Sequence, residues 1–480
     1  MQPNERENQG RPASAQGNDF GLPRTTKVLI LAAMSLGQFM VQMDLTIVNV
    51  ALPSIGRDLR GSVAGLQWVI DGYSVAFASL LLVGGRLGDR SGHKRVYLAG
   101  LAIFALGSGL CALAPSLSWL VGFRVLQGVG AAIELPATLA IVSHTFAPGR
   151  ERSQAIGIWT GAAGSSLVIG PILGGALIGA FGWRSVFIVN LPVVVVIAIA
   201  TLATLVEVAE ARPSRIDLPG QVLGAATLSL LAAGTIEGGS GGFMSTLALG
   251  LLAAGAASLV GFLAVESRQS DPMLPLGYFR LPSYSAANGL GIVMGFVAGG
   301  LLFLYALFFQ VVQGHGPLSA GLRFVPFTLA FVVTGPIAGR LIDRVGHRAP
   351  MAVGCALMAA GCLALARLST TAGSALQSWT LVLVGIGYGL TSTPMAAVAL
   401  GSVPAQRAGM ASSTNLTARL VGVVFGVAVL GAFLPSTRSS GRRFVYSFTS
   451  GLHDALLVAG IVAVAGAAAA ARFVTAKATT

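Results

Sequence analysis

The sequence predicts an all-α polytopic membrane protein with fourteen transmembrane helices, arranged as two six-helix pseudo-repeat bundles with two extra helices between them. Three observations support this prediction. Of the 480 residues, 54% are hydrophobic and only 10% are charged, whereas charged residues make up about 25% of a soluble domain. Apolar runs of about 20 residues, each long enough to cross the hydrocarbon core as a helix, recur along the whole chain. One nine-residue motif occurs twice.

The apolar runs give fourteen expected spans joined by short connections. The expected spans are residues 27–52, 65–84, 96–114, 117–143, 153–178, 183–205, 218–236, 245–265, 284–311, 320–340, 350–367, 376–400, 409–433 and 451–472. An even number of spans places both termini on one side of the membrane. With the tails inside, about twenty Lys and Arg residues are cytoplasmic and about eight are outside, which predicts cytoplasmic termini. The main exception is a loop with Arg438, Arg442 and Arg443, which this topology places outside.

The repeated motif locates the two bundles. The segment GRLGDRSGH at residues 85–93 returns as GRLIDRVGH at residues 339–347, with seven of nine positions identical. Each copy follows the second helix of a six-helix half, as expected for two parallel halves related by an axis along the membrane normal. Six spans occupy about 180 residues, so the longer spacing between the copies leaves room for two extra helices. The predicted organisation is a cytoplasmic tail (1–26), an N-terminal bundle (27–205), a two-helix linker segment (206–282), a C-terminal bundle (283–472) and a second tail (473–480).

Composition excludes several classes of function. The formal net charge is +13, but the basic residues fall mostly between the apolar runs, where they set topology, so we expect no nucleic-acid partner. Cys111, Cys355 and Cys362 are odd in number and lie apart inside apolar segments, so we interpret them as packing residues. The polar first 26 residues lack the order of a cleavable signal. No zinc, phosphate-binding or nucleophile-elbow motif is present, which predicts no enzyme, catalytic residue, metal site or cofactor.

Three acidic residues lie within apolar spans: Asp44, Asp71 and Glu134. An ionised side chain there costs at least about 2.5–3.5 kcal/mol, so we expect these residues to face a cavity. A carboxyl that gains and loses a proton as its exposure alternates provides the chemistry of proton coupling, and it can also neutralise a cationic substrate. The alternative is that some of them are helix caps or interhelical hydrogen-bond partners, and Asp71, near the outer end of its helix, is the most open to that interpretation.

The fourth span carries a polar stripe. Arg124, Gln127, Ala131 and Glu134 recur at i, i+3, i+7 and i+10, which places them on one face of a helix. The stripe puts a fixed cation beside a protonatable group, and we expect Arg124 to form a proton relay with Glu134 or Asp44. The alternative is a static ion pair that only holds helices together.

Four motifs in this order resemble the major facilitator superfamily, specifically its fourteen-helix drug:proton antiporter branch. They are residues 44–53 in the first helix, 85–95 in the loop after the second, 124–132 in the fourth and 161–175 in the fifth. The resemblance spans nearly the whole chain. It implies that the 85–95 segment, here called the gating loop, stabilises the outward-facing state from the cytoplasmic side. It also implies export rather than uptake, because the helix-five motif is associated with antiporters.

Both the gating loop and the fifth helix are rich in glycine. In the loop, glycines permit a tight turn and an aspartate can bond to basic side chains or to a helix N-terminus; the alternative is a basic loop that serves topology alone. The expected gating residues are Gly85, Asp89, Arg90, Gly92 and Lys94, with Asp343 and Arg344 as their counterparts. In the fifth helix the glycine spacing predicts close helix contact, and the proline predicts a kinked hinge. The antiporter-motif residues are Gly161, Gly170, Pro171, Gly174 and Gly175.

Further polar residues in apolar spans are candidates for lining a central cavity. They are Asn49, Gln127, Tyr305, Gln310, Asn415 and Arg419. Aromatic residues of the second half could contact a flat lipophilic substrate, including a cation through the ring face, although such residues more often meet lipid or pack helices.

The sequence therefore predicts a secondary transporter, driven by the proton gradient, that exports lipophilic drugs or antibiotics, cationic ones included, by alternating access. We expect it to lie in the inner (plasma) membrane of a bacterium, in contact with the lipid bilayer, and to function as a monomer. An exporter dedicated to one endogenous metabolite is the alternative. The sequence lacks the motifs of a membrane-embedded enzyme. A two-fold repeat with separate buried carboxylates suits alternating access better than the continuous pore of a channel.

Overall fold

The computed structural model describes residues 22–207, 217–269, 272, 274–368, 374–404, 407–435 and 442–475. These residues contain fourteen spans that are long and apolar enough to cross a membrane, which confirms the predicted number. No strand occurs in the described residues, so the predicted all-α class is confirmed as well.

Eleven spans are single helices and three are made of two pieces. The single helices are α1 (Arg24–Asp58), α2 (Val63–Ser91), α3 (His93–Leu113), α4 (Leu117–Thr145), α5 (Arg150–Phe181), α8 (Leu218–Gly241), α9 (Thr246–Arg268), α13 (Arg348–Leu365), α14 (Ser374–Gly401), α15 (Ala408–Gly431) and α16 (Arg442–Phe473). The composite spans are α6 (Ser185–Ile188) with α7 (Asn190–Thr204), α10 (Pro282–Leu307) with the π-helix η2 (Phe308–Val312), and α11 (Pro317–Arg323) with α12 (Val325–Val345). A 3-10 helix, η1 (Leu276–Arg280), leads into α10.

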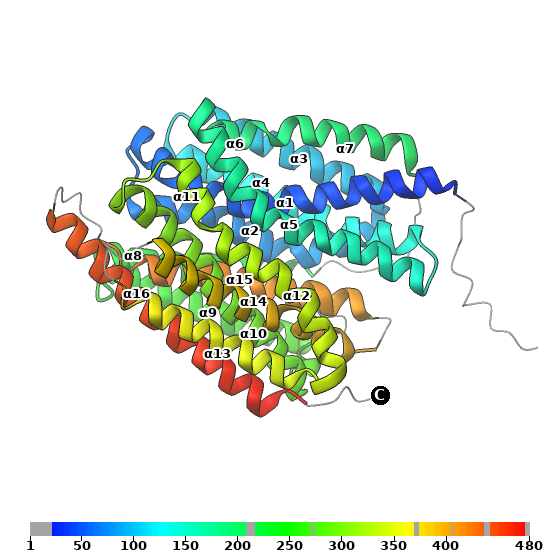
Figure 1. Cartoon of the computed structure of the whole chain (residues 1–480). Coiled ribbons are helices and arrows are strands. Elements are labelled where there is room, and N and C mark those ends of the chain that lie inside the picture. Colours follow the sequence, from blue (N-terminus) through cyan, green and yellow to red (C-terminus); the bar gives the residue numbers. More distant parts are fainter. Residues whose placement is uncertain are drawn as a thin grey trace, which may run out of the picture.

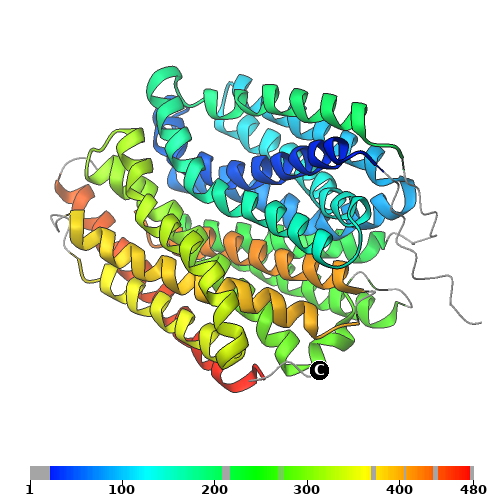
Figure 2. The same ribbon diagram turned by 45° about the vertical axis from the view of Figure 1, so that its right-hand side comes forward.

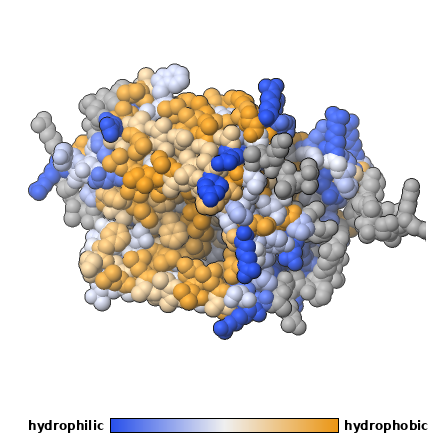
Figure 3. Space-filling view, turned by 90° about the horizontal axis from the view of Figure 1, so that it is seen from below, coloured by the Kyte–Doolittle hydropathy of each residue, from blue (hydrophilic) through white to orange (hydrophobic). Residues whose placement is uncertain are grey.

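The helices form two groups. In Figure 1, α1–α7 occupy the upper part of the molecule and α10 and α12–α16 the lower part, while α11 of the second group extends up beside α5. Figure 2 shows the same two groups. The start of α1 and the end of α16 lie at the same end of the bundle, on the right of Figure 1. We call this the terminal end and the opposite one the far end. Seen from below, the surface is mostly apolar, and strongly polar side chains gather mainly toward the terminal end (Figure 3). A broad apolar surface with polar ends is what a bilayer requires.

The central helix of the second group is α10. In its most apolar window 89% of the residues are buried, the highest share of any span among the described residues. It packs against α15, α16 and α14 of its own group and against α1 of the other. Glycines allow the close approach to α15: a Cβ on Gly295 would lie 1.9 Å from the carbonyl oxygen of Arg419. Helices in lipid associate without a hydrophobic driving force, so the close van der Waals packing that small residues permit stabilises this contact instead.

The two groups contact each other toward the far end. The Gln67 amide of α2 donates to the carbonyls of Val427 (2.8 Å) and Ala428 (3.1 Å) in α15. The Gln310 amide, on the π-helical segment, donates to the Val50 carbonyl of α1 at 2.9 Å. Because each bond joins α1 or α2 to the second group, both must break if the far ends of the groups separate.

Two expectations about loops are wrong. The segment 85–91 was expected to be a loop but forms the last turns of α2, and only Gly92, with φ +93°, separates α2 from α3. The second copy repeats this: α12 runs to Val345, and Gly346 has φ +73°. Positive φ is costly for residues with a Cβ, so one glycine per copy makes the turn. The fourteenth span also begins earlier than expected, at Arg442, so Arg442 and Arg443 are helical.

Three other expectations fall partly or wholly outside the described residues. Arg438 lies outside them, as do residues 1–21 of the expected N-terminal tail and 476–480 of the C-terminal one.

Candidate functional site

The first group encloses a buried ion pair. Arg124 of α4 donates through Nη1 to Asp44 Oδ2 of α1, and the side chains of these two residues are 1% and 0% exposed. The guanidinium also donates through Nε to the Val69 carbonyl at 3.1 Å and lies over the Tyr73 ring, 4.2 Å from its centroid. A buried pair is tolerated when further hydrogen bonds satisfy both charges, and this one has them.

A polar network extends from the ion pair. Gln127 accepts from Arg124 Nη1 at 2.7 Å and donates to Asp44 Oδ1 at 2.8 Å. Asn190 of α7 donates to Asp44 Oδ1 at 3.3 Å and to Ser108 Oγ of α3 at 3.0 Å. Asp44 is therefore bound by a cation and two amides in the interior of the first group.

Asp71 lies in different surroundings, on the α2 face that meets the second group. It is 0% exposed, and neither carboxyl oxygen has a hydrogen-bond partner among the described residues. Residues four apart share a helix face. One turn before Asp71, Gln67 bonds to α15, and one turn after it, Val75 forms an apolar cluster with Val424 of α15. Asp71 therefore lies at the interface between α2 and α15, with no partner that would stabilise its charge.

Glu134 is buried inside the first group. It is 0% exposed and neither of its carboxyl oxygens has a hydrogen-bond partner within the described residues. Its backbone packs against α3, since a Cβ on Gly100 would lie 2.7 Å from the Glu134 nitrogen and 2.8 Å from its Cβ. The stripe from Arg124 to Glu134 thus faces the interior of the first group.

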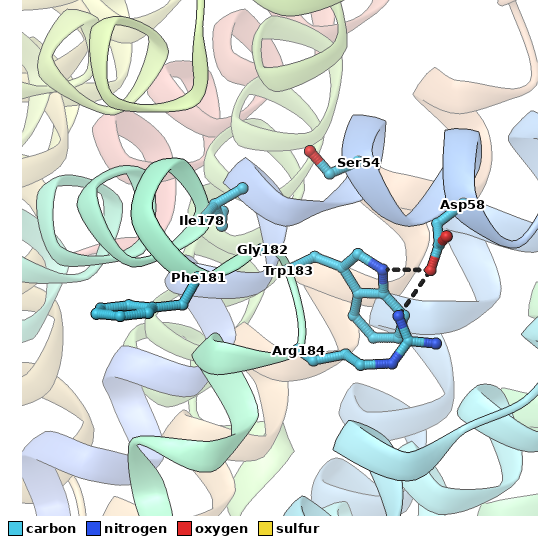
Figure 4. Close-up of a pocket in the computed structure, with 7 residues that line it drawn as sticks. All are labelled: Ser54, Asp58, Ile178, Phe181, Gly182, Trp183 and Arg184. Carbon is cyan, nitrogen blue, oxygen red and sulfur yellow. Dashed lines mark hydrogen bonds and ion pairs between the residues drawn. The ribbon is translucent and has the colours of Figure 1, made fainter.

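We expected the acidic residues to face a cavity, and the structure instead encloses all three in protein. A hollow of about 320 Å³ lies at the far end, where α1 and α5 end, and is shown in Figure 4. Its lining residues are Ser54, Asp58, Ile178, Phe181, Gly182, Trp183 and Arg184. In it, Asp58 accepts from the Trp183 indole at 2.9 Å and from Arg184 at 2.7 Å. For Asp44 the enclosure is tolerated because Arg124 balances its charge, whereas Asp71 and Glu134 are enclosed with no hydrogen-bond partner among the described residues.

The glycines of α5 divide into two sets. A Cβ on Gly170 would lie 2.2 Å from Thr46 Oγ1, and one on Gly174 2.6 Å from Ile47, so both allow close contact with α1. A Cβ on Gly175 would lie 2.6 Å from the Leu318 Cα of α11, and the Pro171 carbonyl meets Gly321 of α11. Gly161, by contrast, has nothing within 4 Å, so close helix contact was predicted correctly for the far-end glycines and wrongly for this one.

The gating loop is bonded to the residues that follow α7 and to the linker segment. Asp89 pairs with His93 at 3.6 Å, and Arg90 is exposed. The Lys94 ammonium donates to the Leu205 carbonyl, while Glu207 accepts from the backbone N–H of Lys94 at 3.2 Å.

The neighbours of the remaining gating residues are less informative. The nearest atom to a Cβ on Gly85 would be in Pro136, 3.8 Å away. In the second copy, Asp343 and Arg344 are exposed. Burial lowers the pKa of the adjacent His347, which favours its neutral form.

The candidates of the second half are spread along α10 and α15. Tyr305 is buried and stacks edge-on with Phe308 and Phe309, at 5.6 and 5.2 Å between ring centroids. Asn415 donates to the Ala287 carbonyl at 3.5 Å, and Arg419 is half-buried on the face toward Gly291 of α10. In the first half, Asn49 donates to the carbonyl of Leu45 in its own helix. The structure does not bring these residues together into one site.

Sequence reasoning missed two amides, a hydroxyl and an aromatic ring. Gln67, Asn190 and Ser108 complete the polar contacts, and the Tyr73 ring lies against Arg124. Gln67 and Asn190 are uncharged amides inside or beside apolar runs. A buried amide requires partners almost as a buried charge does, so weighting amides like acids would have found these two.

Comparison with known proteins gives the family. The model of the Major Facilitator Superfamily matches residues 34–427. This chain belongs to that superfamily. Its relatives include the multidrug resistance protein Stp of Mycobacterium tuberculosis, 39% identical over 415 residues, which cover 86% of this chain and 77% of Stp. The tetracenomycin C resistance and export protein of Streptomyces glaucescens is 37% identical over 85% of this chain and 76% of that protein.

Solved structures agree on the fold of this Major Facilitator Superfamily member. A bacterial homologue of the human lysosomal transporter Spinster, in an inward-facing and unoccupied conformation, matches with a TM-score of 0.63 and 19% identity, covering 94% of this chain and 97% of that one. A D-xylose–proton symporter matches with a TM-score of 0.66 and 15% identity, covering 94% and 98%. The chain is a multi-pass membrane protein of a transporter family, not an enzyme.

Proposed function

We propose that this protein exports lipophilic drugs or antibiotics across a bacterial plasma membrane in exchange for protons, with both termini in the cytoplasm and the far end outside. The relatives named for multidrug resistance and for antibiotic export support the substrate class. Basic residues at the helix ends on the terminal side, among them Arg90, Lys94, Arg150 and Arg344, support the orientation, because Lys and Arg concentrate on the cytoplasmic side. The domain organisation into two six-helix bundles and a two-helix segment is part of this proposal.

The observation that carries proton coupling is the position of Asp71. Its carboxyl is enclosed at the interface of α2 and α15 without a partner. An ionised carboxylate there would be strongly unfavourable, whereas the neutral acid is tolerated. Loss of the proton therefore favours separation of α2 from α15 and entry of water from the far end, and proton binding allows the far end to close again.

Glu134 is the second proton-binding group in this proposal, because it shares with Asp71 full burial and the lack of a partner. The pair of Asp44 and Arg124 has balanced charges and positions α1 against α4. Its role is to hold the relay in place rather than to carry the proton.

The test uses purified protein in proteoliposomes, with ethidium as the transported dye. Asp71→Asn fixes the neutral form, so a proton gradient should no longer accelerate transport. We expect the acceleration to fall by about 5- to 150-fold, the range of a coupling energy of 1–3 kcal/mol, while gradient-independent exchange of dye continues. Glu134→Gln should behave in the same direction.

The matched control is Glu266→Gln, which neutralises another buried carboxyl, at the end of α9, away from the α2–α15 interface. It should keep the acceleration. If Asp71→Asn responded to the gradient as the unsubstituted protein does, Asp71 would not be the coupling site.

Several relatives favour a second candidate, an exporter dedicated to one compound. Their names each mention a single antibiotic: tetracenomycin C, methylenomycin A and cephamycin. A resistance screen across unrelated compounds in a sensitive host separates the two. Protection against many unrelated compounds supports multidrug export, and protection against one chemical class supports the dedicated exporter.

A further inference from the structure

The two extra helices between the groups are α8 and α9, here called the inserted pair. Of these, α8 packs against both α2 and α15, where the two helix groups meet. Val75 of α2, Ala232 of α8 and Val424 of α15 form one apolar cluster. Nearer the far end, α8 touches α15 closely, since a Cβ on Gly239 would lie 2.5 Å from the Cβ of Ala432, the residue that follows α15. This helix therefore contacts both groups at once.

Toward the terminal end, α8 and its connections attach to the first group. The Gln221 amide of α8 donates to the Ser79 carbonyl of α2. Arg86, also in α2, donates to the Pro272 carbonyl at 2.8 Å, just after α9. On the other side of the insertion, Glu207 accepts from the backbone of Lys94 at the start of α3. Both ends of the inserted pair are thus bonded to α2 or α3.

The next element along the chain is attached to the second group instead. Ser285 of α10 donates to the Phe279 carbonyl of η1 at 2.5 Å, and the Phe279 and Tyr284 rings lie 5.2 Å apart. Arg407, just before α15, lies 5.8 Å from the Tyr278 ring centroid. Between Pro272 and Leu276 the chain therefore passes from contacts with the first group to contacts with the second group.

We propose that α8 and α9 move with the first group and act as a strap across the α2–α15 line, holding the far end closed through the contact of Gly239 with Ala432. This inference rests on the proposed alternating-access transport. When the far ends separate, α8 stays with α2 and its contact with α15 breaks. The contact consists of small residues that permit close packing, the main source of helix affinity in lipid.

The test compares two crosslinks in a background in which the three cysteines are replaced by alanine. The pair Ala232→Cys and Val424→Cys, whose side chains belong to one apolar cluster, joins α8 to α15 through a short bis-methanethiosulfonate reagent, whose two disulfides can be reduced. The control pair, Ser79→Cys and Gln221→Cys, joins α8 to α2 by a short bifunctional thiol reagent. Gradient-driven ethidium efflux is measured before crosslinking, after it and after reduction.

We expect the α8–α15 crosslink to reduce efflux at least tenfold and reduction to restore it, while the α8–α2 crosslink leaves efflux within twofold of the uncrosslinked sample. Undiminished efflux with the α8–α15 crosslink closed would overturn the strap, and so would equal inhibition by both crosslinks. If neither reduced double variant nor the cysteine-free background showed gradient-driven efflux, the failure would be that of the proposed function.

A second variant tests the contact without a covalent bond. Gly239→Leu introduces a side chain where Ala432 lies, so it should weaken the far-closed state and raise the apparent KM for dye presented from the terminal side by about fivefold. Gly250→Leu in α9 is the matched control, because a Cβ there has nothing within 4 Å. An unchanged KM in Gly239→Leu, or an equal change in the control, contradicts the proposal.

Discussion

The buried pair of Asp44 and Arg124 gives the sharpest stability prediction. Asp44→Asn leaves Arg124, 1% exposed, without the anion that balances it. Breaking a buried pair by removing one partner costs about 3–5 kcal/mol, whereas removing both charges is often close to neutral. Asp44→Asn should therefore destabilise the protein by about 3–5 kcal/mol, and the double variant Asp44→Asn with Arg124→Gln should recover about half of that loss or more.

The measurement is thermal unfolding in detergent, followed by reaction of a thiol dye with Cys111, Cys355 and Cys362. All three cysteines are free and buried, so they react only when the structure opens. The expected order of midpoints is unsubstituted protein, then double variant, then Asp44→Asn. A double variant that loses as much as the sum of the two single variants would show that the two charges are not coupled and would refute this reasoning.

Two further predictions follow from contacts at the far end. Gly431→Ala places a Cβ 2.4 Å from the Gln67 amide nitrogen, so it should break the hydrogen bonds of Gln67 to α15 and open the far end. The opening is measured as faster thiol labelling of Val427→Cys, and an unchanged labelling rate would contradict the role of Gln67. Asp58→Asn weakens a half-exposed ion pair with Arg184, so it should lower the free energy of unfolding by less than about 1 kcal/mol. The same thermal assay measures it, and a loss of stability as large as that of Asp44→Asn would mean that burial does not decide the strength of these pairs.

The number and order of the spans were predictable because the length of an apolar run alone decides whether it can cross the membrane, whatever tertiary contacts it makes. The turn between α2 and α3 was less predictable. The motif at 85–93 has three glycines, and only Gly92 adopts positive φ. Gly85 and Gly88 remain helical: the nearest atom to a Cβ on Gly85 lies 3.8 Å away in Pro136, and a Cβ on Gly88 would lie 2.5 Å from the His93 ring. The glycine pattern alone therefore does not show which of the three makes the turn.

The candidate site was predictable as a set of residues but not as an arrangement. Burial cost identifies Asp44, Asp71 and Glu134 from sequence alone, since each interrupts an apolar run. Which of them has a partner depends on helix rotation and on distant residues. Asn190, for example, reaches Asp44 from 146 positions away. Local pattern does not contain that information, so the difference between the paired Asp44 and the unpaired Asp71 came only from the structure.

The enclosure of α10 has a consequence for how the chain is assembled during synthesis. Its closest neighbour, α15, is made more than 100 residues later. Until then the glycine face of α10 has only lipid or the earlier helices beside it. The ninth span, which contains α10, therefore remains at the edge of the nascent bundle and becomes enclosed only when translation is nearly complete. Ribosome-stalled chains that end before α15 should leave α10 accessible to lipid-soluble photoreactive probes, and full-length chains should not.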